Sequence, residues 1–234
     1  MADSAAVHGL ATAEASVRFD SVSLELGGRQ ILSSLSFAVE AGETALLLGP
    51  SGAGKTTILD CLLGLHCLDS SRIRVVKSDL AAIDPACWRQ SIAWVGQAPR
   101  LFHGSLKANL LRAVPHASED DLWQALRLAG AIDLVESMPR GLGTVIGEDG
   151  FGLSGGEMRR IALARAALRK DATLILADEP TAGLDSETAC DVAAGLEEMA
   201  RGRTMLLATH DPKLMKIGPR IIRLGACPRE EVNA

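Results

Sequence analysis

The stretch ALLLGPSGAGKTT, residues 45–57, decides the fold, because it joins a short apolar run to a helix start through a glycine-rich turn. Within it, GPSGAGKT fits the P-loop pattern GxxxxGK(S/T), whose glycines let backbone N–H groups close around phosphates. We expect Lys55 to contact the β and γ phosphates of a nucleotide and the Thr56 hydroxyl to hold Mg²⁺. A glycine-rich turn that binds nothing is the alternative, which the lysine, the threonine and the flanking elements together disfavour. The candidate nucleotide-binding residues here are Gly49, Pro50, Ser51, Gly52, Ala53, Gly54, Lys55, Thr56 and Thr57.

An acidic strand end, TLILADEP (173–180), complements this turn. Its apolar residues predict a buried strand that carries Asp178 to the carboxyl edge of a sheet, where ligands of α/β proteins bind. Asp178 can then orient Mg²⁺, and Glu179 is placed to polarise a water molecule. An acidic pair after a strand can also cap a helix, but its combination with the P-loop favours the catalytic interpretation.

The remaining pattern predicts an α/β protein with a P-loop NTPase core. Closely spaced β-prone runs in residues 16–48 predict an N-terminal antiparallel β subdomain. Apolar residues at helical spacing in 105–137, with Ser118 as a helix N-cap, predict an inserted helical subdomain over about 98–158. Further strands are expected in 72–76, 92–97, ATLILAD, TMLLATH and RIIRL, and helices from Lys55 to about Leu65, in 85–91, in 186–200 and in 211–217. Strands that alternate with helices indicate a mostly parallel sheet with helices on its faces.

Composition limits the possible functions. The chain has 234 residues, a net charge of −5, 3% aromatic residues and no basic stripe, which argues against nucleic-acid binding. Its five cysteines form no CxxC pair, which disfavours a disulfide framework or a zinc site, and Cys61 is expected to be a buried thiol. No apolar run approaches the roughly 20 residues that span a bilayer. Residues 1–15 lack Lys and Arg and are expected to be a flexible leader, followed by a single domain over 16–234.

Further motifs follow in a fixed order: Gln97 in WVGQAP, LSGGE (153–157), AGLD (182–185) and His210 in ATHD. With the P-loop and the acidic strand end, they make residues 16–225 resemble the nucleotide-binding domain of ATP-binding cassette (ABC) transporters. The resemblance implies ATP and Mg²⁺ as cofactors, Thr56, Gln97 and Asp178 as metal ligands, and Glu179 and His210 as catalytic residues. It also implies head-to-tail pairing of two such domains, with each ATP between the P-loop of one and the signature of the other. The signature residues are Leu153, Ser154, Gly155, Gly156 and Glu157, and Asp185 belongs to the D-loop.

Three positions depart from the family pattern. One is Ala177, at a usually bulkier strand position before Asp178, where we expect a packing variation only. The signature usually ends in glutamine, whereas this chain has Glu157, which has capping-box spacing from Ser154. Glu157 therefore either caps its helix or places a carboxylate near the partner's phosphate, and we favour the cap. Leu26 stands where the family has an aromatic residue that stacks on adenine, so apolar contact replaces stacking.

Two segments resemble the exporter branch: TVIGEDG (144–150) and LFHGSLKANL (101–110). In exporters the second segment and the Q-loop face the cytoplasmic ends of the membrane domain. Residues 84–106 and GFGLSGG (150–156) look most like the thiol-reductant exporters of cytochrome bd assembly.

The resemblance implies an ATPase that powers export through a separate transmembrane domain, as a homo- or heterodimer at the cytoplasmic face of the bacterial inner membrane, soluble when isolated. One alternative is a soluble cassette ATPase of translation or DNA repair, although these usually carry two cassettes or a coiled-coil insertion. The other is a low-activity regulatory partner in a heterodimer. Glu179, His210 and the intact SGG argue against it, whereas Glu157 and Leu26 leave it open.

Overall fold

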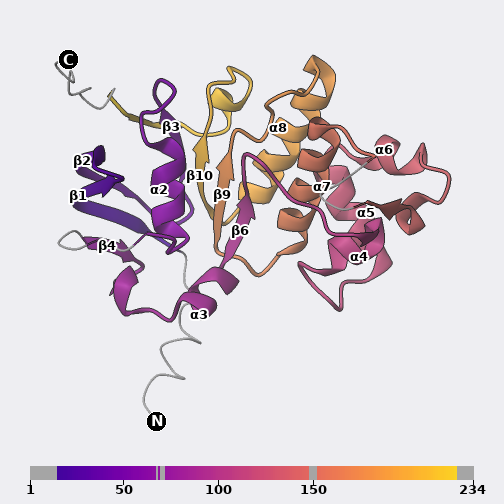
Figure 1. Cartoon of the computed structure of the whole chain (residues 1–234), viewed down its shortest axis with the longest axis horizontal. Coiled ribbons are helices and arrows are strands. Elements are labelled where there is room, and N and C mark those ends of the chain that lie inside the picture. The colour runs from indigo at the N-terminus through magenta and orange to yellow at the C-terminus, as the bar shows by residue number, and fades with distance from the viewer. Residues whose placement is uncertain (1–14, 67, 69–71, 148–151, 226–234) are drawn as a thin grey trace, which may run out of the picture.

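In the computed structural model, which describes residues 15–66, 68, 72–147 and 152–225, the chain forms two larger sheets and a helical region. Figure 1 shows the N-terminal sheet at one end, the parallel strands in the centre and the helices α4–α6 at the other end. Residues 1–14 of the predicted leader lie outside the described residues, and Ala15 is already buried in a hydrophobic core. The predicted mixed α/β class is confirmed.

The N-terminal sheet is antiparallel, as predicted. Its strands lie in the order β2-β1-β4-β5: β1 (Val17–Leu26), β2 (Arg29–Val39), β4 (Arg72–Val75) and β5 (Ser78–Asp79). The turn between β1 and β2 consists of Gly27 and Gly28, with φ of 59° and 75°. A two-residue hairpin needs positive φ at both positions, which glycine adopts without strain.

The central sheet is parallel and has the order β11-β3-β10-β9-β6. Its strands are β3 (Thr44–Leu48), β6 (Ile92–Val95), β9 (Leu174–Asp178), β10 (Thr204–Ala208) and β11 (Arg220–Arg223). Because β3, β10 and β9 are neighbours, the loops that follow them meet at one edge of the sheet. These are the loops that carry the P-loop, Glu179 and His210.

Each face of the parallel sheet borders its own hydrophobic core. Leu46 pairs with Leu207 and Leu207 with Ala177, and this row faces the core shared with α7 (Gly155–Leu168) and α8 (Ser186–Ala200). The next row, Ala45, Leu206 and Leu176, faces α2 (Lys55–Leu62) and the antiparallel sheet. Burial of each such leucine contributes about 1.5–3 kcal/mol. The apolar strands are therefore buried on both faces, as their sequences predict.

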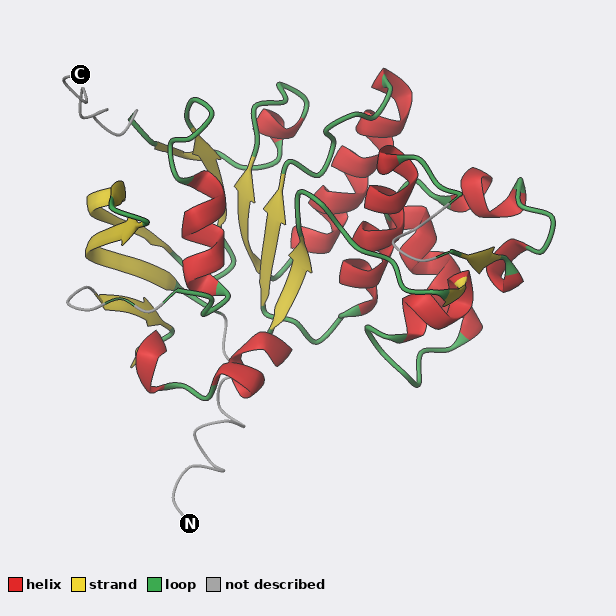
Figure 2. Ribbon diagram, viewed as in Figure 1, coloured by secondary structure: helices red, strands yellow, loops and turns green. Residues whose placement is uncertain are grey.

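The helical region packs on the side of the parallel sheet away from the N-terminal sheet (Figure 2). It contains α4 (Leu106–Leu111), α5 (Glu119–Leu128) and α6 (Ile132–Glu136), and α5 packs against α7 and α8. The predicted N-cap Ser118 accepts a hydrogen bond from the Asp121 N–H. At Gly195 of α8, a Cβ would overlap the Leu128 carbonyl oxygen, so the two helices touch through backbone. The division of the domain at about 98–158 stays a prediction.

The structure differs from the sequence prediction at two places. The helix expected over 211–217 is only a 3₁₀ turn, η4 (Leu214–Lys216), because Pro212 and Gly218 leave too few residues between them for an α-helix. A small ladder, β7 (Gly104–Ser105) with β8 (Val145–Ile146), was not predicted. The short helix α3 (Pro85–Gln90) lies where it was expected. The described residues also form the 3₁₀ turns η1 (Leu80–Ala82) and η2 (Gly141–Gly143). Among the described residues, no helix is both long and apolar enough for a bilayer crossing.

Candidate nucleotide-binding and hydrolysis site

The glycine-rich turn between β3 and α2 has the backbone that a phosphate cradle needs. Gly52 has a φ of 79°, and no atom lies within 4 Å of the position that its Cβ would occupy. Gly54, which precedes the helix, has a φ of 87°, and a Cβ there would lie 2.7 Å from Leu32 Cδ2. Glycine is therefore required at 54 by both conformation and space, and the turn presents its N–H groups at the start of α2. The Lys55 ammonium crosses the turn and donates to the Gly49 carbonyl at 2.7 Å.

Thr56 and Asp178 lie together, as the sequence predicts for a metal site. The Thr56 hydroxyl donates to Asp178 Oδ2 at 2.6 Å, although 122 residues separate them. Asp178 is 2% exposed, and burial raises its pKa above the usual value, which the Thr56 hydrogen bond partly offsets. No cluster of three or more His, Cys, Asp or Glu fit for a metal exists among the described residues. One carboxylate and one hydroxyl fit Mg²⁺, which is commonly bound by few protein ligands together with substrate phosphates.

Glu179 and His210 form the second pair at this edge. His210 Nδ1 lies 2.8 Å from Glu179 Oε1, and the Glu179 N–H donates to the Ala208 carbonyl at 2.8 Å. Glu179 has a φ of 48°, an uncommon value for a residue with a side chain, directly after its strand ends. Its side chain is 10% exposed, whereas that of His210 is 80% exposed. A shielded carboxylate thus lies beside an accessible imidazole, an arrangement suited to orienting a water molecule.

Gln97 lies on the exposed loop after β6. Among the described residues, its side chain has no hydrogen bond to Thr56 or Asp178, so the metal-ligand role stays a prediction. Its carbonyl accepts a hydrogen bond from Arg159 Nη2 at 3.0 Å, and Arg159 Nη1 donates to the Ala182 carbonyl. Arg159 therefore joins the Gln97 loop, helix α7 and the loop before Asp185. No motif position marks Arg159, so its role cannot be read from the sequence.

Asp185 forms the N-cap of α8. Its Oδ1 accepts hydrogen bonds from the N–H groups of Glu187 and Thr188, both at 3.0 Å. The Thr188 hydroxyl donates to the other carboxylate oxygen at 2.6 Å. These bonds to Thr188 and Glu187 lower the pKa of Asp185 to about 2. The side chain that the D-loop motif predicts thus also fixes the start of a helix.

The signature residues form the N-terminus of α7. The Ser154 N–H donates to Glu157 Oε2 at 2.7 Å, and the Glu157 N–H donates to Ser154 Oγ at 3.3 Å, so both bonds of the expected capping box are present. The Gly155 Cβ position has no neighbour within 4 Å, so this first turn is open on its outer side. Leu153 packs against the adjacent core. Residues 148–151 of the preceding segment lie outside the described residues.

Leu26 lies at the end of β1, beside the hairpin turn, and is 39% exposed. The same hairpin reaches the P-loop, because Leu32 of β2 contacts the Gly54 position. The predicted adenine contact is compatible with this placement and stays a prediction. Cys61, on the inner face of α2, is 1% exposed, as expected for a buried thiol.

Comparison with known proteins gives the same assignment. The family model described as ABC transporter matches residues 32–182. The mycobactin import ATP-binding/permease protein IrtB of Mycolicibacterium thermoresistibile is 38% identical over 88% of this chain and 36% of its own length. The ATP-dependent lipid A-core flippase of Dechloromonas aromatica is 38% identical over 95% of this chain and 38% of its own.

A solved structure of a bacterial Atm1-family ABC exporter with ATP bound matches with a TM-score of 0.86 and 32% identity, over 90% of this chain and 37% of that one. The chain thus spans little more than a third of the length of these relatives. With the P-loop, the Thr56–Asp178 pair and the Glu179–His210 pair at one sheet edge, this chain belongs to the ABC transporter family as an ATP-binding domain.

Proposed function

We propose that this chain hydrolyses ATP and thereby drives a membrane exporter through a transmembrane domain. The observation that carries the proposal is the meeting of two pairs, Thr56 with Asp178 and Glu179 with His210, beside the P-loop at one sheet edge. The similarity to proteins named as ATP-binding/permease protein, flippase and exporter supports it. Bound Mg-ATP would supply the phosphoryl group whose transfer to water releases the energy.

Each side chain has a separate task in this reaction. Lys55 and the N–H groups of the glycine-rich turn bind the β and γ phosphates, and Thr56 and Asp178 hold the metal with Gln97. Glu179 accepts the proton of the attacking water, because its carboxylate is shielded and oriented. His210 holds that carboxylate through Nδ1 and leaves its other ring nitrogen free for the γ-phosphate.

The signature is not bonded to the P-loop of its own chain in the part of the chain that the structure describes. Among the described residues, no hydrogen bond joins 153–157 to 49–57, and the start of α7 is open at Gly155. A helix N-terminus attracts anions, so we infer that it binds the nucleotide held by a second domain, in a homo- or heterodimer. The complete site then needs two chains.

This dependence on two chains is tested by dilution. Specific ATPase activity should rise with protein concentration and reach a plateau once the dimer forms. Analytical ultracentrifugation with ATP, over the same concentrations, shows whether dimer and activity appear together. Flat specific activity in a protein that is monomeric throughout would contradict the composite site.

The segment 101–110 is the expected contact with the membrane domain. Asn109 is buried and holds this segment in place. Its Oδ1 accepts a hydrogen bond from the Phe102 N–H, and its Nδ2 donates one to the Phe102 carbonyl, both at 2.8 Å. The Phe102 ring is left outside, and the residue is 47% exposed. We infer that this face binds a transmembrane domain at the cytoplasmic side of the membrane. Co-purification with such a domain distinguishes the exporter from a soluble ATPase, and steady-state hydrolysis distinguishes it from a regulatory partner.

A thiol reductant is the cargo that residues 84–106 and 150–156 favour by resemblance. The relatives named here differ in cargo, since one name refers to mycobactin and another to lipid A-core. We therefore expect the membrane domain to select the cargo. Thiol uptake into inverted vesicles that contain the complete transporter would test this; vesicles that accumulate no cysteine or glutathione with ATP would contradict it.

A further inference from the structure

Arg159 of α7 donates hydrogen bonds to two loops at the nucleotide edge of the parallel sheet. Its Nη2 donates to the Gln97 carbonyl at 3.0 Å, and its Nη1 donates to the Ala182 carbonyl. These acceptors lie 62 and 23 residues away in sequence, on the loops that follow β6 and β9. One guanidinium therefore joins the Gln97 loop (96–100) to the Asp185 loop (179–185).

No other hydrogen bond joins these two loops among the described residues. The strands β6 and β9 are neighbours, and their ladder ends with Val95 opposite Ala177. Beyond that pair, the two loops leave the sheet side by side without a shared backbone hydrogen bond in the described chain. The hydrogen bonding that fixes one loop relative to the other is therefore that of Arg159.

The face of α7 that carries Arg159 also lets the second loop approach closely. Arg159 lies three residues after Gly156, so the two positions share a helix face. A Cβ at Gly156 would lie 3.0 Å from Leu184 Cδ2 and 3.3 Å from the Gly183 carbonyl oxygen, so the loop rests on helix backbone. The first turn of α7, which carries the signature, thus packs against the loop that leads to Asp185.

The Arg159 charge has no carboxylate partner in the part of the chain that the structure describes. Its Nε is enclosed and likewise has no hydrogen-bond partner there. A buried polar atom without a partner costs free energy. Because the guanidinium is a rigid planar fork, it can reach two carbonyls at once, which a more flexible lysine does less well. We attribute the cost at Nε to this double contact.

Other bonds fix the loop after β9 on its opposite side. The Thr181 hydroxyl donates to Asp211 Oδ2 at 2.7 Å, and the Lys213 ammonium donates to the Ser186 carbonyl at 3.0 Å. Both partners, Asp211 and Lys213, lie on the loop after β10. The loop after β9 is thus joined to the loop after β10 by these bonds and to the loop after β6 by Arg159.

We infer that Arg159 is a positioning residue, which fixes the Gln97 loop and the Asp185 loop relative to each other. The metal-binding side and the partner-facing side of the site are then set together. The inference rests on the proposed function, in which Gln97 holds the metal. Because Arg159 acts through Gln97 and leaves the P-loop untouched, its loss should impair hydrolysis and the use of Mg²⁺, whereas ATP binding should remain.

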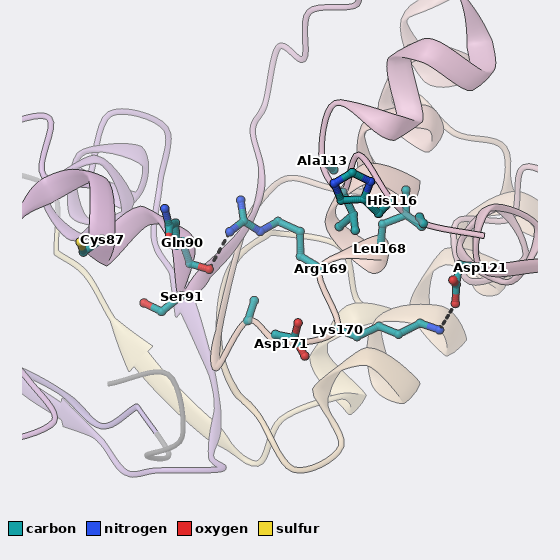
Figure 3. A pocket seen from close by; sticks show the side chains of 13 residues that line it. Cys87, Gln90, Ser91, Ala113, His116, Asp121, Leu168, Arg169, Lys170 and Asp171 are labelled. Atoms are coloured by element: carbon teal, nitrogen blue, oxygen red, sulfur yellow. Dashed lines mark hydrogen bonds and ion pairs between the residues drawn. The ribbon is translucent and has the colours of Figure 1, made fainter. Parts of the chain in front are cut away.

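Arg169 provides the matched control, because it joins α7 to the opposite end of β6. Its Nη2 donates to the Gln90 carbonyl at 2.6 Å, which is the dashed line between these residues in Figure 3. Gln90 ends α3 shortly before β6, at the sheet edge away from the nucleotide site. Arg169→Met therefore removes the same charge and a bond of the same kind at a distance from the predicted metal.

Steady-state ATPase assays test the inference, at the protein concentration where specific activity is maximal. Methionine keeps an apolar stem at 159 and removes both bonds. Arg159→Met should lower kcat about tenfold and raise the Mg²⁺ concentration for half-maximal rate about threefold to tenfold. Affinity for a fluorescent ATP analogue without Mg²⁺ should stay within about twofold of wild type. Arg159→Lys should recover part of kcat, and Arg169→Met should leave kcat and the Mg²⁺ requirement within about twofold.

A double-mutant cycle distinguishes positioning from a general loss of stability. If Arg159 acts through Gln97, the combined loss of kcat in Arg159→Met/Gln97→Ala should be at least about threefold smaller than the product of the single losses. A purely structural role predicts that the two losses multiply. Thermal melts identify a variant that fails to fold. Arg159→Lys, with and without Gln97→Ala, then completes the same cycle.

Hydrogen exchange in the nucleotide-free chain gives a readout that needs no activity. The Ala182 and Leu184 amides donate to the Glu179 and Thr181 carbonyls, both at 3.1 Å, so their exchange reports opening of the loop. Arg159→Met should accelerate exchange of these amides at least about fivefold, whereas Arg169→Met should leave it within about twofold of wild type.

Two results would overturn the inference. One is Arg159→Met with kcat and Mg²⁺ requirement within about twofold of wild type, and the other is a cycle in which the losses multiply. Exchange separates the inference from the proposed function. Faster exchange in Arg159→Met of a chain that hydrolyses no ATP refutes the proposed function and leaves the positioning role. Normal hydrolysis with no response of exchange or kcat to Arg159→Met refutes the positioning role alone.

Discussion

Replacement of Glu179 by glutamine tests the catalytic assignment with a minimal structural change. Glutamine has the same length and can still hydrogen-bond the His210 ring, whose Nδ1 lies 2.8 Å from Glu179 Oε1. The residue is 8% exposed, so a change of volume would disturb packing, whereas glutamine fills the same space. The variant therefore loses charge and basicity and keeps shape.

The size of the effect follows from the role of a general base. Such a base accelerates reactions about 10²–10⁴-fold, equivalent to about 2.7–5.5 kcal/mol of activation free energy. An amide cannot accept the proton of the attacking water near neutral pH. We expect kcat for ATP hydrolysis to fall at least about a hundredfold.

ATP binding should survive in this variant, because Lys55 and Thr56 are unchanged. Burial is the main cause that raises the pKa of Asp178, and the charge of Glu179 adds to it. Glutamine removes this repulsion beside the phosphates, so affinity should be equal or higher. We further propose that hydrolysis removes the γ-phosphate that holds the two domains together, so the variant should accumulate as an ATP-bound dimer.

The assay combines phosphate release at saturating Mg-ATP with size-exclusion chromatography, with and without ATP. Glu136→Gln is the matched control, because it removes an exposed carboxylate at the end of α6 and should hydrolyse ATP at the wild-type rate. If Glu179→Gln hydrolyses ATP within about threefold of wild type, Glu179 is not the base and the mechanism is wrong.

Four further predictions concern single side chains. Lys55→Ala should weaken a fluorescent ATP analogue at least about tenfold, because charge-assisted hydrogen bonds contribute about 1.5–3 kcal/mol; equal affinities would contradict the P-loop assignment. Glu157→Gln should change stability by about 1 kcal/mol or less and leave ATP-driven dimerisation unchanged, since glutamine also completes a capping box; a stronger dimer on gel filtration would show that the carboxylate opposes closure. The pKa of Asp185 is lowered to about 2, so its stabilisation is present above the unfolded value near 3.8 and is lost as pH falls toward 2. The melting temperature of wild type should therefore drop over that range relative to Asp185→Asn, and parallel curves would refute this. Burial raises the pKa of Cys61 to about 12, so iodoacetamide at pH 8 should modify the exposed Cys190 first and Cys61 only after unfolding, as peptide mass spectrometry can measure.

Much of the fold is predictable because its signals are local. The apolar run before Gly49 predicts a buried strand. The glycine pair at 27–28 predicts a tight hairpin turn. The pairing of Thr56 with Asp178 follows from topology. The loop after β3 leads into α2, which carries Thr56, and Asp178 ends β9; the two parallel strands are separated by β10 alone and end at the same sheet edge. The ABC family assignment therefore needed only motifs in order.

Other features depend on contacts that no local pattern encodes. Arg159 makes its bonds with two carbonyls on loops distant in sequence, and any arginine of α7 looks equivalent beforehand. Likewise, Arg89, Arg112, Arg165 and Arg169 line one groove only because α3, α4 and α7 come together. The helix expected over 211–217 was wrong. The apolar residues have helical spacing, but the segment between Pro212 and Gly218 is too short to form an α-helix.

The lack of a side chain at Gly195 affects how closely α5 and α8 can pack. A methyl group there would overlap the Leu128 carbonyl oxygen, so α5 and α8 could no longer touch through backbone at this point. Helix α8 starts directly after Asp185, and α5 rests on α7, whose first turn is the signature. The missing side chain at Gly195 thus permits the close approach of α5 to α8, and a larger residue there would have to displace one of the helices on which the signature and the D-loop are built.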